Sequence, residues 1–394
     1  MELRGFRYTG IESRLALNFF IMFLIDCLVG VYLPMILKDR GFDSVDIGQL
    51  RAYGYAMVAF APFLYALLTE KIGNRRKALQ IGSFLSGITV IGLLLDLNYM
   101  FFAVLIVTQS FFQQGTAAQL DAHSINTMED QKRYGAVRIW GSIGFVVTVI
   151  TGGFISENWG LHALIYYMIA VQACLIFAVL LLPQDKVSKD QAKESKLISH
   201  KFKLTPNFVL LLLVVFFIFI SQGVYNNFFM IYVTSLGFSE TTGGTIMSIG
   251  TVAEMVMLLG SIVLLSKFKT SHLLAISCLL TAVRWLMQGW GGDSIAMLII
   301  SQFGHAFTFA LLHATVIHFI QKSFNEGTVG RATGLYASFG LGAGNIVGSL
   351  LSGYLWDSLG PQYAYTACAI MALIGMFLSL AITSPKPQGV PAHA

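Results

Sequence analysis

Residues 15–37 read LALNFFIMFLIDCLVGVYLPMIL, an apolar run of 23 residues that contains one charged side chain, Asp26. An α-helix needs about 20 apolar residues to cross the roughly 30 Å of hydrocarbon in a bilayer. The run lacks the period-two alternation of the shorter strands that build a transmembrane barrel. Because lipid offers the backbone no hydrogen bonds, an apolar run of this length predicts a membrane-spanning helix.

The composition of the whole chain matches that of this run. Of its 394 residues, 56% are hydrophobic and 11% are charged, whereas soluble domains carry about 25% charged residues. So few charges cannot cover a water-facing surface, and we therefore predict an all-α membrane protein of twelve transmembrane helices. The predicted helices are 14–37, 45–69, 77–95, 98–123, 136–156, 161–182, 207–234, 242–266, 271–290, 293–320, 329–354 and 361–383.

The chain also shows signs of an internal repeat of six helices. A shift of 196 residues superposes Gly48 on Gly244, and a shift of 200 residues superposes Gly153 on Gly353. An even number of helices per copy makes the repeat parallel, and transporters with such repeats hold their substrate between the copies. The predicted units are an N-terminal six-helix bundle at 1–183, a cytoplasmic linker at 184–206 and a C-terminal six-helix bundle at 207–394.

Basic residues predict the orientation of the chain. With the N-terminus in the cytoplasm, 21 of the 25 Lys and Arg residues fall on the inner side. Only Lys38 and Arg40 then fall on the outer side, as the positive-inside rule requires. We expect a multi-pass protein of the cell inner (plasma) membrane, with both termini cytoplasmic. The net charge of +5 follows from topology, so we expect no nucleic-acid partner. We also expect a monomer that contacts membrane lipid.

Charged residues within the predicted helices are candidates for function, because a charge near the bilayer centre costs about 2.5–3.5 kcal/mol on insertion scales. Asp121 and Arg138 flank one short loop, so we expect them to pair. Glu254 and Arg284 lie on consecutive helices, which favours a second pair. Arg51 also lies in a predicted helix. These charged residues are Asp26, Arg51, Asp121, Arg138, Glu254 and Arg284.

Asp26 differs from these pairs, because we find no basic residue at its depth in its own helix or the next one. Burial without a counter-ion favours the neutral form of a carboxyl group. Asp26 is therefore a candidate proton carrier. The alternative is a protonated side chain that bonds a neighbouring carbonyl group.

Uncharged polar residues also recur at helical spacing. Gln109 and Gln113 share one face of the fourth predicted helix, and Gln222 and Asn226 share one face of the seventh. We predict that these four side chains line a substrate cavity, although hydrogen bonds between helices are the alternative. His305 lies near the centre of the tenth predicted helix. It could relay a proton or bond another helix.

The spacing of the histidines argues against a metal site. His305, His313 and His318 are eight and five residues apart, which does not place all three on one helix face. We therefore expect no metal, and no cofactor other than the proton as coupling ion. We also find no nucleophile–base constellation or phosphate-binding loop, so we do not expect an enzyme.

The loop after the second predicted helix carries a family signature. Residues 66–76, ALLTEKIGNRR, resemble the motif G-x-x-x-D-R/K-x-G-R/K-R/K of the major facilitator superfamily. The segment departs from that motif at Ala66, Glu70 and Asn74. Together with twelve predicted helices and a central loop, it identifies the chain as similar to this superfamily. The resemblance implies two pseudo-symmetric bundles that work by alternating access.

Other segments resemble more particular transporters. The stretches YGAVRIWGS at 134–142, VAE at 252–254 and VRW at 283–285, followed by His305, look like the phenylpropionate permease family. They look more distantly like the oligosaccharide–proton symporters typified by lactose permease. In those symporters an acid on helix 4 and an arginine on helix 5 bind the sugar, positions that Asp121 (after a small gap) and Arg138 match. Residues that match the coupling positions of helices 8, 9 and 10 are Glu254, Arg284 and His305.

Two departures from the symporters affect the expected substrate. Thr308 stands where they place a proton-accepting glutamate, so Asp26 or Glu254 would have to carry the proton. Phe145 stands where they stack sugar on a tryptophan. Phe145 can stack but offers no N–H donor, which favours an aromatic or organic-acid substrate over a sugar.

The sequence therefore predicts a proton-coupled symporter of a small organic solute, with an aromatic carboxylate as one candidate. Arg138 would bind the substrate, Asp121 would hold Arg138 in the empty site, and Arg284 and His305 would tune the coupling carboxylate. The alternatives are a sugar or nucleoside proton symporter, efflux of a drug or metabolite, and a membrane receptor that transports nothing.

Overall fold

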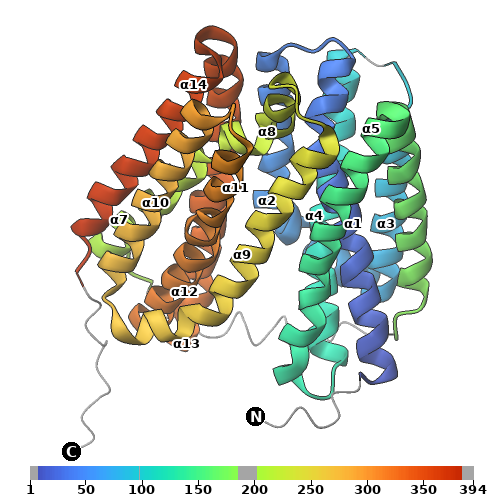
Figure 1. Ribbon diagram of the computed structural model, residues 1–394. Coiled ribbons are helices and arrows are strands. Elements are labelled where there is room, and N and C mark those ends of the chain that lie inside the picture. The colour runs from blue at the N-terminus through green and yellow to red at the C-terminus, as the bar shows by residue number, and fades with distance from the viewer. Residues whose placement is uncertain (1–7, 97, 185–201, 384–394) are drawn as a thin grey trace, which may run out of the picture.

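A computed structural model of the chain describes residues 8–96, 98–184 and 202–383, and all regular elements in these ranges are helices (Figure 1). The first set of elements comprises α1 (Gly10–Asp39), α2 (Ser44–Ile72), α3 (Arg75–Gly92), α4 (Tyr99–Thr127), the 3-10 turn η1 (Gln131–Arg133) and α5 (Tyr134–Leu180). The second set comprises α7 (Pro206–Ser221), α8 (Gly223–Ser235), α9 (Glu240–Lys267), α10 (Thr270–Gly291), α11 (Ile295–Phe303), η2 (Ala306–Leu311), α12 (Leu312–Ser323), α13 (Glu326–Leu335), η3 (Tyr336–Ala343) and α14 (Gly344–Leu380).

Two glycines divide the longest helices into two spans each. Gly160 in α5 and Gly360 in α14 have φ angles of +80° and +78°, a region that only glycine enters without strain. α7 with α8, α11 to α12, and α13 with the start of α14 each form one span, because their axes continue across short irregular turns. Together with α1 to α4, α9 and α10, the described ranges hold twelve spans. Eight candidate spans follow from length and apolarity alone, and two of these contain the glycine breaks.

Side chains at the helix starts satisfy backbone donors that have no partner inside the helix. Thr9 and Glu12 form a capping box at α1, in which each side chain binds the other's backbone N–H. Asp43, Asn74 and Asn98 accept a bond from the third residue of α2, α3 and α4. These caps fix where the helices begin, within four residues of the predicted starts.

Three predicted helices are interrupted. The helix predicted at 207–234 breaks at Gln222, between α7 and α8. The helices predicted at 293–320 and 329–354 each contain a π-helical segment, η2 and η3. A π-turn bonds residue i to i+5 and is frequent at functional sites, so these segments mark places to examine. The predicted linker falls mostly outside the described residues, and its bounds stay a prediction.

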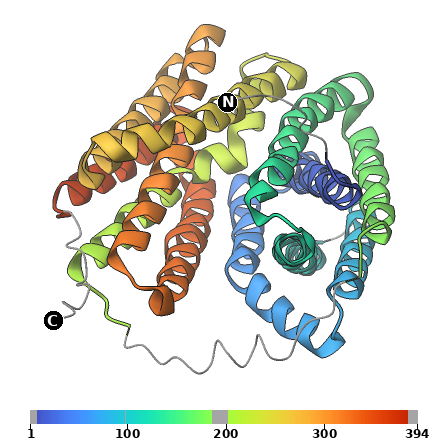
Figure 2. The ribbon, with the colours of Figure 1, turned by 90° about the horizontal axis from the view of Figure 1, so that it is seen from below.

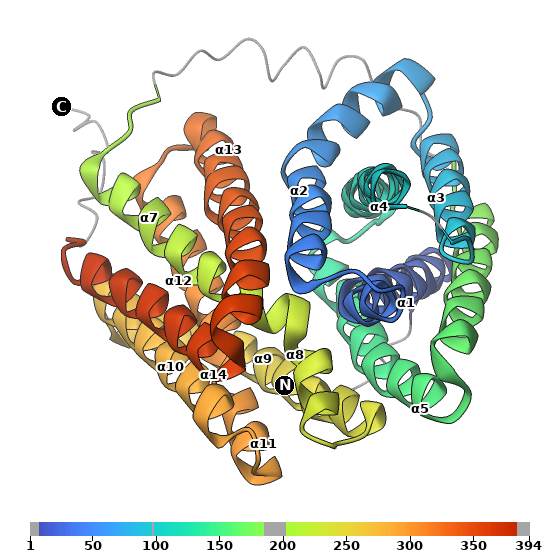
Figure 3. The ribbon, with the colours of Figure 1, turned by 90° about the horizontal axis from the view of Figure 1, so that it is seen from above.

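The helices form two groups that lie side by side (Figures 2 and 3). In the first group α1 packs on α5 and α2 packs on α4; in the second, α14 packs on α7 and α10. The groups meet where α2 contacts α14 and where α5 contacts α9. Figure 1 shows them approaching at the α1–α2 connection and diverging toward the end that carries the N-terminus. We call the end at the α1–α2 connection, where the two groups approach each other, the closed end.

Glycines let the two groups touch backbone to backbone at the closed end. In what we call the α2–α14 seam, a Cβ atom on Gly48 would lie 2.6 Å from the carbonyl oxygen of Ser349, and one on Gly353 would collide with the carbonyl of Ser44. In the α5–α9 seam, a Cβ atom would collide with Glu240 if added at Gly153, and with Val149 if added at Gly244. Gly48, Gly153, Gly244 and Gly353 are the glycines that the repeat superposes.

Candidate functional site

A cavity of about 490 Å³ lies between the two groups of helices. Side chains from α1, α2, α5, α8, α9, η2 and η3 contribute to its wall, so both halves shape it. Seven of the eleven predicted site residues line this central cavity: Asp26, Arg138, Phe145, Gln222, Asn226, Glu254 and His305. The position between two related groups of helices is where such transporters bind their substrate.

Arg138 on α5 forms the positive part of the wall. Its Nε lies 3.7 Å from Oδ1 of Asp121, which also accepts a hydrogen bond of 2.7 Å from the hydroxyl of Tyr134. The guanidinium group lies 4.1 Å from the ring centroid of Phe23 and 5.4 Å from that of Phe19. The predicted pair therefore exists, and it holds a cation against aromatic rings at the edge of the cavity. Asp121 itself does not line the cavity.

Asp26 on α1 has a cation nearby, contrary to our expectation from the sequence. Arg51 on α2 lines the same cavity, and its charge acts on Asp26 together with that of Arg138. Among the described residues, no cation lies within 4 Å of the carboxylate, which accepts one hydrogen bond of 3.3 Å from Nε2 of Gln114. Asp26 is thus close to positive charge but not paired.

The depth argument failed because it ignored side-chain length. Asp26 lies 13 residues before the end of α1 at Asp39, which is about 20 Å of helix, whereas Arg51 lies seven residues, or about 10 Å, below the start of α2. An extended arginine side chain covers most of that difference. The two charged ends therefore face one cavity although their Cα atoms differ in depth.

Glu254 on α9 pairs with His305 rather than with Arg284. Nε2 of His305 lies 3.3 Å from Oε2 of Glu254. Arg284 is 1% exposed and has no carboxylate oxygen within 4 Å in the described ranges. Its guanidinium group instead lies 4.3 Å from the ring centroids of both Tyr225 and Trp285. The predicted pairing of Glu254 with Arg284 is therefore wrong. Glu254 and His305 line the cavity, and Arg284 does not.

The π-helical segment η2 shapes this wall. His305, Phe309 and His313 stack in sequence, with ring centroids 6.4 Å and 6.0 Å apart. Nδ1 of His313 then forms a hydrogen bond of 2.6 Å with the hydroxyl of Tyr336, which is the first residue of η3. The stack that begins at η2 thus reaches η3 through His313 of α12, and no sequence signal marks either π-helical segment.

The predicted polar residues divide between cavity lining and helix packing. Gln222 and Asn226 line the central cavity, and Asn226 also donates a hydrogen bond of 3.4 Å to Asn345. Gln109 lines an adjoining pocket of about 190 Å³, which shares Asp26 with the central cavity. Gln113 lines neither space, since its amide bonds the carbonyl of Met22 and the hydroxyl of Ser86. Gln113 therefore follows the alternative given above, a hydrogen bond between helices, rather than cavity lining.

Several cavity residues were not singled out from the sequence. The half-buried Tyr55 touches Arg51 and the buried Tyr225 touches Arg284, and Asn345 belongs to the glycine-rich start of α14. Tyr55 follows Arg51 by four residues, a spacing that puts both on one helix face. That spacing was the one signal that could have identified it.

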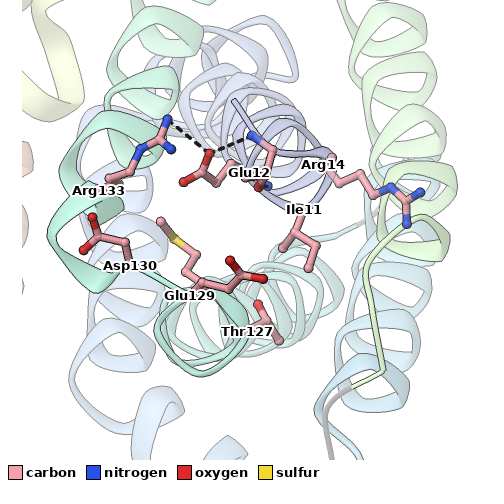
Figure 4. Close-up of a pocket in the computed structure, with 10 residues that line it drawn as sticks. Ile11, Glu12, Arg14, Thr127, Glu129, Asp130 and Arg133 are labelled. Carbon is pink, nitrogen blue, oxygen red and sulfur yellow. Dashed lines mark hydrogen bonds and ion pairs between the residues drawn. The ribbon is translucent and has the colours of Figure 1, made fainter. Parts of the chain in front are cut away.

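A separate hollow of about 330 Å³ lies beside the start of α1, away from the central cavity (Figure 4). Glu12 sits at its edge, 3.2 Å from the guanidinium group of Arg133, and also accepts the Thr9 backbone bond of the capping box. Glu129 and Asp130 add negative charge from the loop before α5. None of the eleven predicted site residues lines this hollow. The ion pair ties the start of α1 to that loop.

Twelve spans in two related groups around a charged cavity define a secondary transporter of the major facilitator superfamily. The family model described as "MFS_1 like family" matches residues 13–367. The chain belongs to this family. The sequence-based assignments to the superfamily, to its twelve-helix fold and to transporters rather than enzymes are confirmed.

Known transporters resemble the chain along most of its length. The probable 3-phenylpropionic acid transporter of Escherichia coli is 23% identical over 384 residues, which cover 96% of this chain and 98% of the relative. The maltose permease of Geobacillus stearothermophilus is 25% identical over 286 residues, 72% of each chain. A crystal structure of the nucleoside transporter NupG superposes with a TM-score of 0.80 at 20% identity, over 95% of this chain and 99% of that one.

Proposed function

We propose that the protein is a proton-coupled symporter of a small organic anion, with an aromatic carboxylate as the leading class. The observation that carries this proposal is Arg138, a cation at the cavity wall that rests on the rings of Phe19 and Phe23. A guanidinium group binds a carboxylate through two parallel hydrogen bonds. Phe145 lines the same cavity and offers a ring for an aromatic substrate to stack on.

Asp121 gives the site a resting state. Its oxygen is 3.7 Å from Arg138, longer than a good hydrogen bond, and Tyr134 supplies a better-placed donor at 2.7 Å. An incoming carboxylate can therefore take Arg138 while Asp121 keeps its bond to Tyr134. Because Asp121 keeps a hydrogen-bond donor in Tyr134, it is not left without a partner when the substrate takes Arg138.

Proton coupling rests on Asp26 and Glu254, the two carboxylates that line the cavity among the described residues. Each faces the space that becomes open to one side of the membrane or the other during alternating access. Glu254 has His305 at 3.3 Å, and Arg284 lies behind His305 as a buried positive charge. Arrival of a proton on either carboxylate removes one negative charge from a low-dielectric cavity, which changes the balance between the two conformations.

The basic residues orient this arrangement. The positive-inside rule puts the divergent end, with both termini, in the cytoplasm of a cell whose inner membrane holds the protein. The described conformation is then the one open toward the cytoplasm, with the outer end closed by the two seams. One chain forms the whole cavity, so the transporting unit is a monomer.

A nucleoside is the second candidate substrate. Gln222 and Asn226 place amide groups at the cavity wall, and the side-chain oxygen of Gln222 has no hydrogen-bond partner among the described residues. An amide edge can read the hydrogen-bonding edge of a base. The likeness to NupG extends over nearly the whole chain.

Uptake into proteoliposomes distinguishes these candidates. With an inward proton gradient we expect accumulation of 3-phenylpropionate and not of uridine or maltose. Arg138→Gln should lower uptake of the acid at least tenfold, because a hydrogen bond to a charged group contributes about 1.5–3 kcal/mol.

Arg40→Gln is the matched control for the loss of one arginine. Arg40 pairs with Asp96 outside the cavity, so its loss should change uptake less than twofold. Accumulation of uridine without that of the acid would replace the leading candidate with the second. Equal losses for both arginine variants would remove Arg138 from the site.

A further inference from the structure

Arg51 connects the central cavity to the closed end of the transporter. Its Nε donates to Oδ1 of Asn227 at 3.2 Å, and its Nη2 donates to the hydroxyl of Tyr55 at 3.1 Å. Arg51 belongs to α2 and Asn227 to α8, so the first of these bonds joins the two halves of the molecule. Within the described ranges, no carboxylate lies within 4 Å of the guanidinium group.

Asn227 passes this contact on to the α2–α14 seam. Its amide nitrogen donates to the hydroxyls of Ser349 and Ser352, both at 3.0 Å, and the side chain is 2% exposed. Ser349 is the residue whose carbonyl Gly48 approaches, and Ser352 precedes Gly353. Arg51 is therefore linked, through the hydrogen bonds of Asn227, to the place where α2 and α14 touch.

Arg51 also has an oppositely charged neighbour, Asp26, with which it forms no ion pair. Asp26 lines the same two spaces as Arg51, the central cavity and the adjoining pocket, and is not ion-paired. The other charged side chains of the cavity are engaged, Arg138 with Asp121 and Glu254 with His305. Asp26 and Arg51 are thus the one oppositely charged couple of the described cavity wall that is close but unpaired.

We propose that Arg51 is the positioning residue through which the ionisation of Asp26 controls the α2–α14 seam. When Asp26 is protonated, Arg51 stays on Asn227 and the seam is closed, as described. When Asp26 is ionised, its carboxylate draws Arg51 away from Asn227 and the seam loosens. The proposal rests on the role of Asp26 in proton coupling under the proposed function.

This exchange moves protons inward, which is the direction in which a symporter uses the proton gradient. An empty carrier with ionised Asp26 opens the seam toward the outside, where the proton concentration is higher. Proton binding returns Arg51 to Asn227, closes the seam and leaves the cavity open to the cytoplasm. Loss of the proton there resets the cycle.

Other groups surround Asp26 and must be separated from Arg51 in any test. Tyr55 faces it from α2, Arg138 from α5 and Gln114 from α4, with Cys27 beside it on α1. Across the cavity lie Glu254 and His305. The pH dependence of the seam therefore needs to be measured in variants of Asp26 and Arg51 separately.

The repeat supplies a matched control at the other seam. The 196-residue shift places Met247 where Arg51 stands and Gln222 where Asp26 stands, so the α5–α9 seam has no such couple. It has instead an exposed bond between its halves, from the backbone N–H of Thr241 to Oε2 of Glu157 at 3.2 Å. Glu157→Gln weakens a bond between the halves without touching the proposed switch.

Spin labels test the proposal without a substrate. Lys38→Cys and Ser358→Cys place labels on the two halves at the closed end, in a background that lacks the four native cysteines. Double electron–electron resonance in nanodiscs at pH 5 and pH 8 then reports the fraction with a closed seam. In the labelled parent we expect more closed molecules at pH 5.

The variants should separate coupling from simple packing. In Asp26→Asn the seam should remain closed at both pH values. Arg51→Gln should raise the ratio of open to closed molecules about tenfold and remove the pH dependence of that ratio. Arg51→Lys should restore part of that dependence, and Glu157→Gln should keep all of it. A normal pH response in Arg51→Gln would overturn the proposal.

Asn227→Asp covers the case in which Arg51→Gln does not fold. It gives Arg51 a carboxylate across the seam, so we expect a closed seam at pH 8 as well as at pH 5. An unchanged opening at pH 8 would also overturn the proposal. Because no substrate is added, an error in the proposed substrate class leaves these results unaffected.

Discussion

Two seams close the same end of the transporter, and they share their glycines but not their charges. The α2–α14 seam is built on Gly48 and Gly353, and the α5–α9 seam on Gly244 and Gly153. In each case a backbone carbonyl of the opposite half occupies the space of a side chain. The repeat has therefore preserved the close approach itself.

The charges near the seams follow no such symmetry. Asp26 and Arg51 stand beside the α2–α14 seam, whereas Gln222 and Met247 occupy the superposed positions beside the α5–α9 seam. Residues common to both seams provide the mechanical contact that any rocking motion needs. Residues present at one seam only are those that can link the motion to a proton.

The largest expected effect tests the glycine contacts that the two seams share. Gly353→Val and Gly153→Val each insert a side chain where the opposing carbonyl of Ser44 or Glu240 lies, and neither backbone can yield cheaply. In both variants the rate of transport should fall more than a hundredfold, and the distance between the two halves at the closed end should be longer. Gly260→Val on α9, where nothing lies within 4 Å, is the matched control. Full activity in either seam variant would remove that seam from the gate.

A smaller and equal effect is expected at the two helix breaks. Gly160 and Gly360 have φ near +80° and no atom within 4 Å of an added Cβ. Gly160→Ala and Gly360→Ala should each lower the free energy of unfolding by about 1–3 kcal/mol, the cost of a side chain in a backbone region that is essentially restricted to glycine. Thermal unfolding in detergent measures it. Unequal losses would show that the breaks are not equivalent in the two halves.

The sequence carried the fold because the signals for it are local. Twenty-residue apolar runs specify the spans, and the glycine offsets specify the repeat whose close contacts the structure shows. Asp121 and Arg138 could be paired in advance, since they flank one short loop. These inferences needed only helix length and adjacency.

The rest of the site depends on features without a local signal. The partner of Glu254 is His305 rather than Arg284, and His305 directly precedes the π-helical segment η2, which no residue pattern announces. Arg51 faces the same cavity as Asp26 because of the length of its side chain, and Asn227 bonds Arg51 from the other half. Contacts between halves depend on the conformation of the carrier, which composition and spacing do not encode.

The most direct test of the central claim is accumulation driven by a proton gradient in proteoliposomes, with the compound that the uptake panel identifies. The account predicts concentrative uptake by the wild type and its loss in Asp26→Asn and in Glu254→Gln. Glu254→Gln should still exchange substrate across the membrane without a gradient, because its binding residues are intact. Full gradient-driven accumulation in both variants would contradict the account, since neither intramembrane carboxylate would then couple the proton to transport.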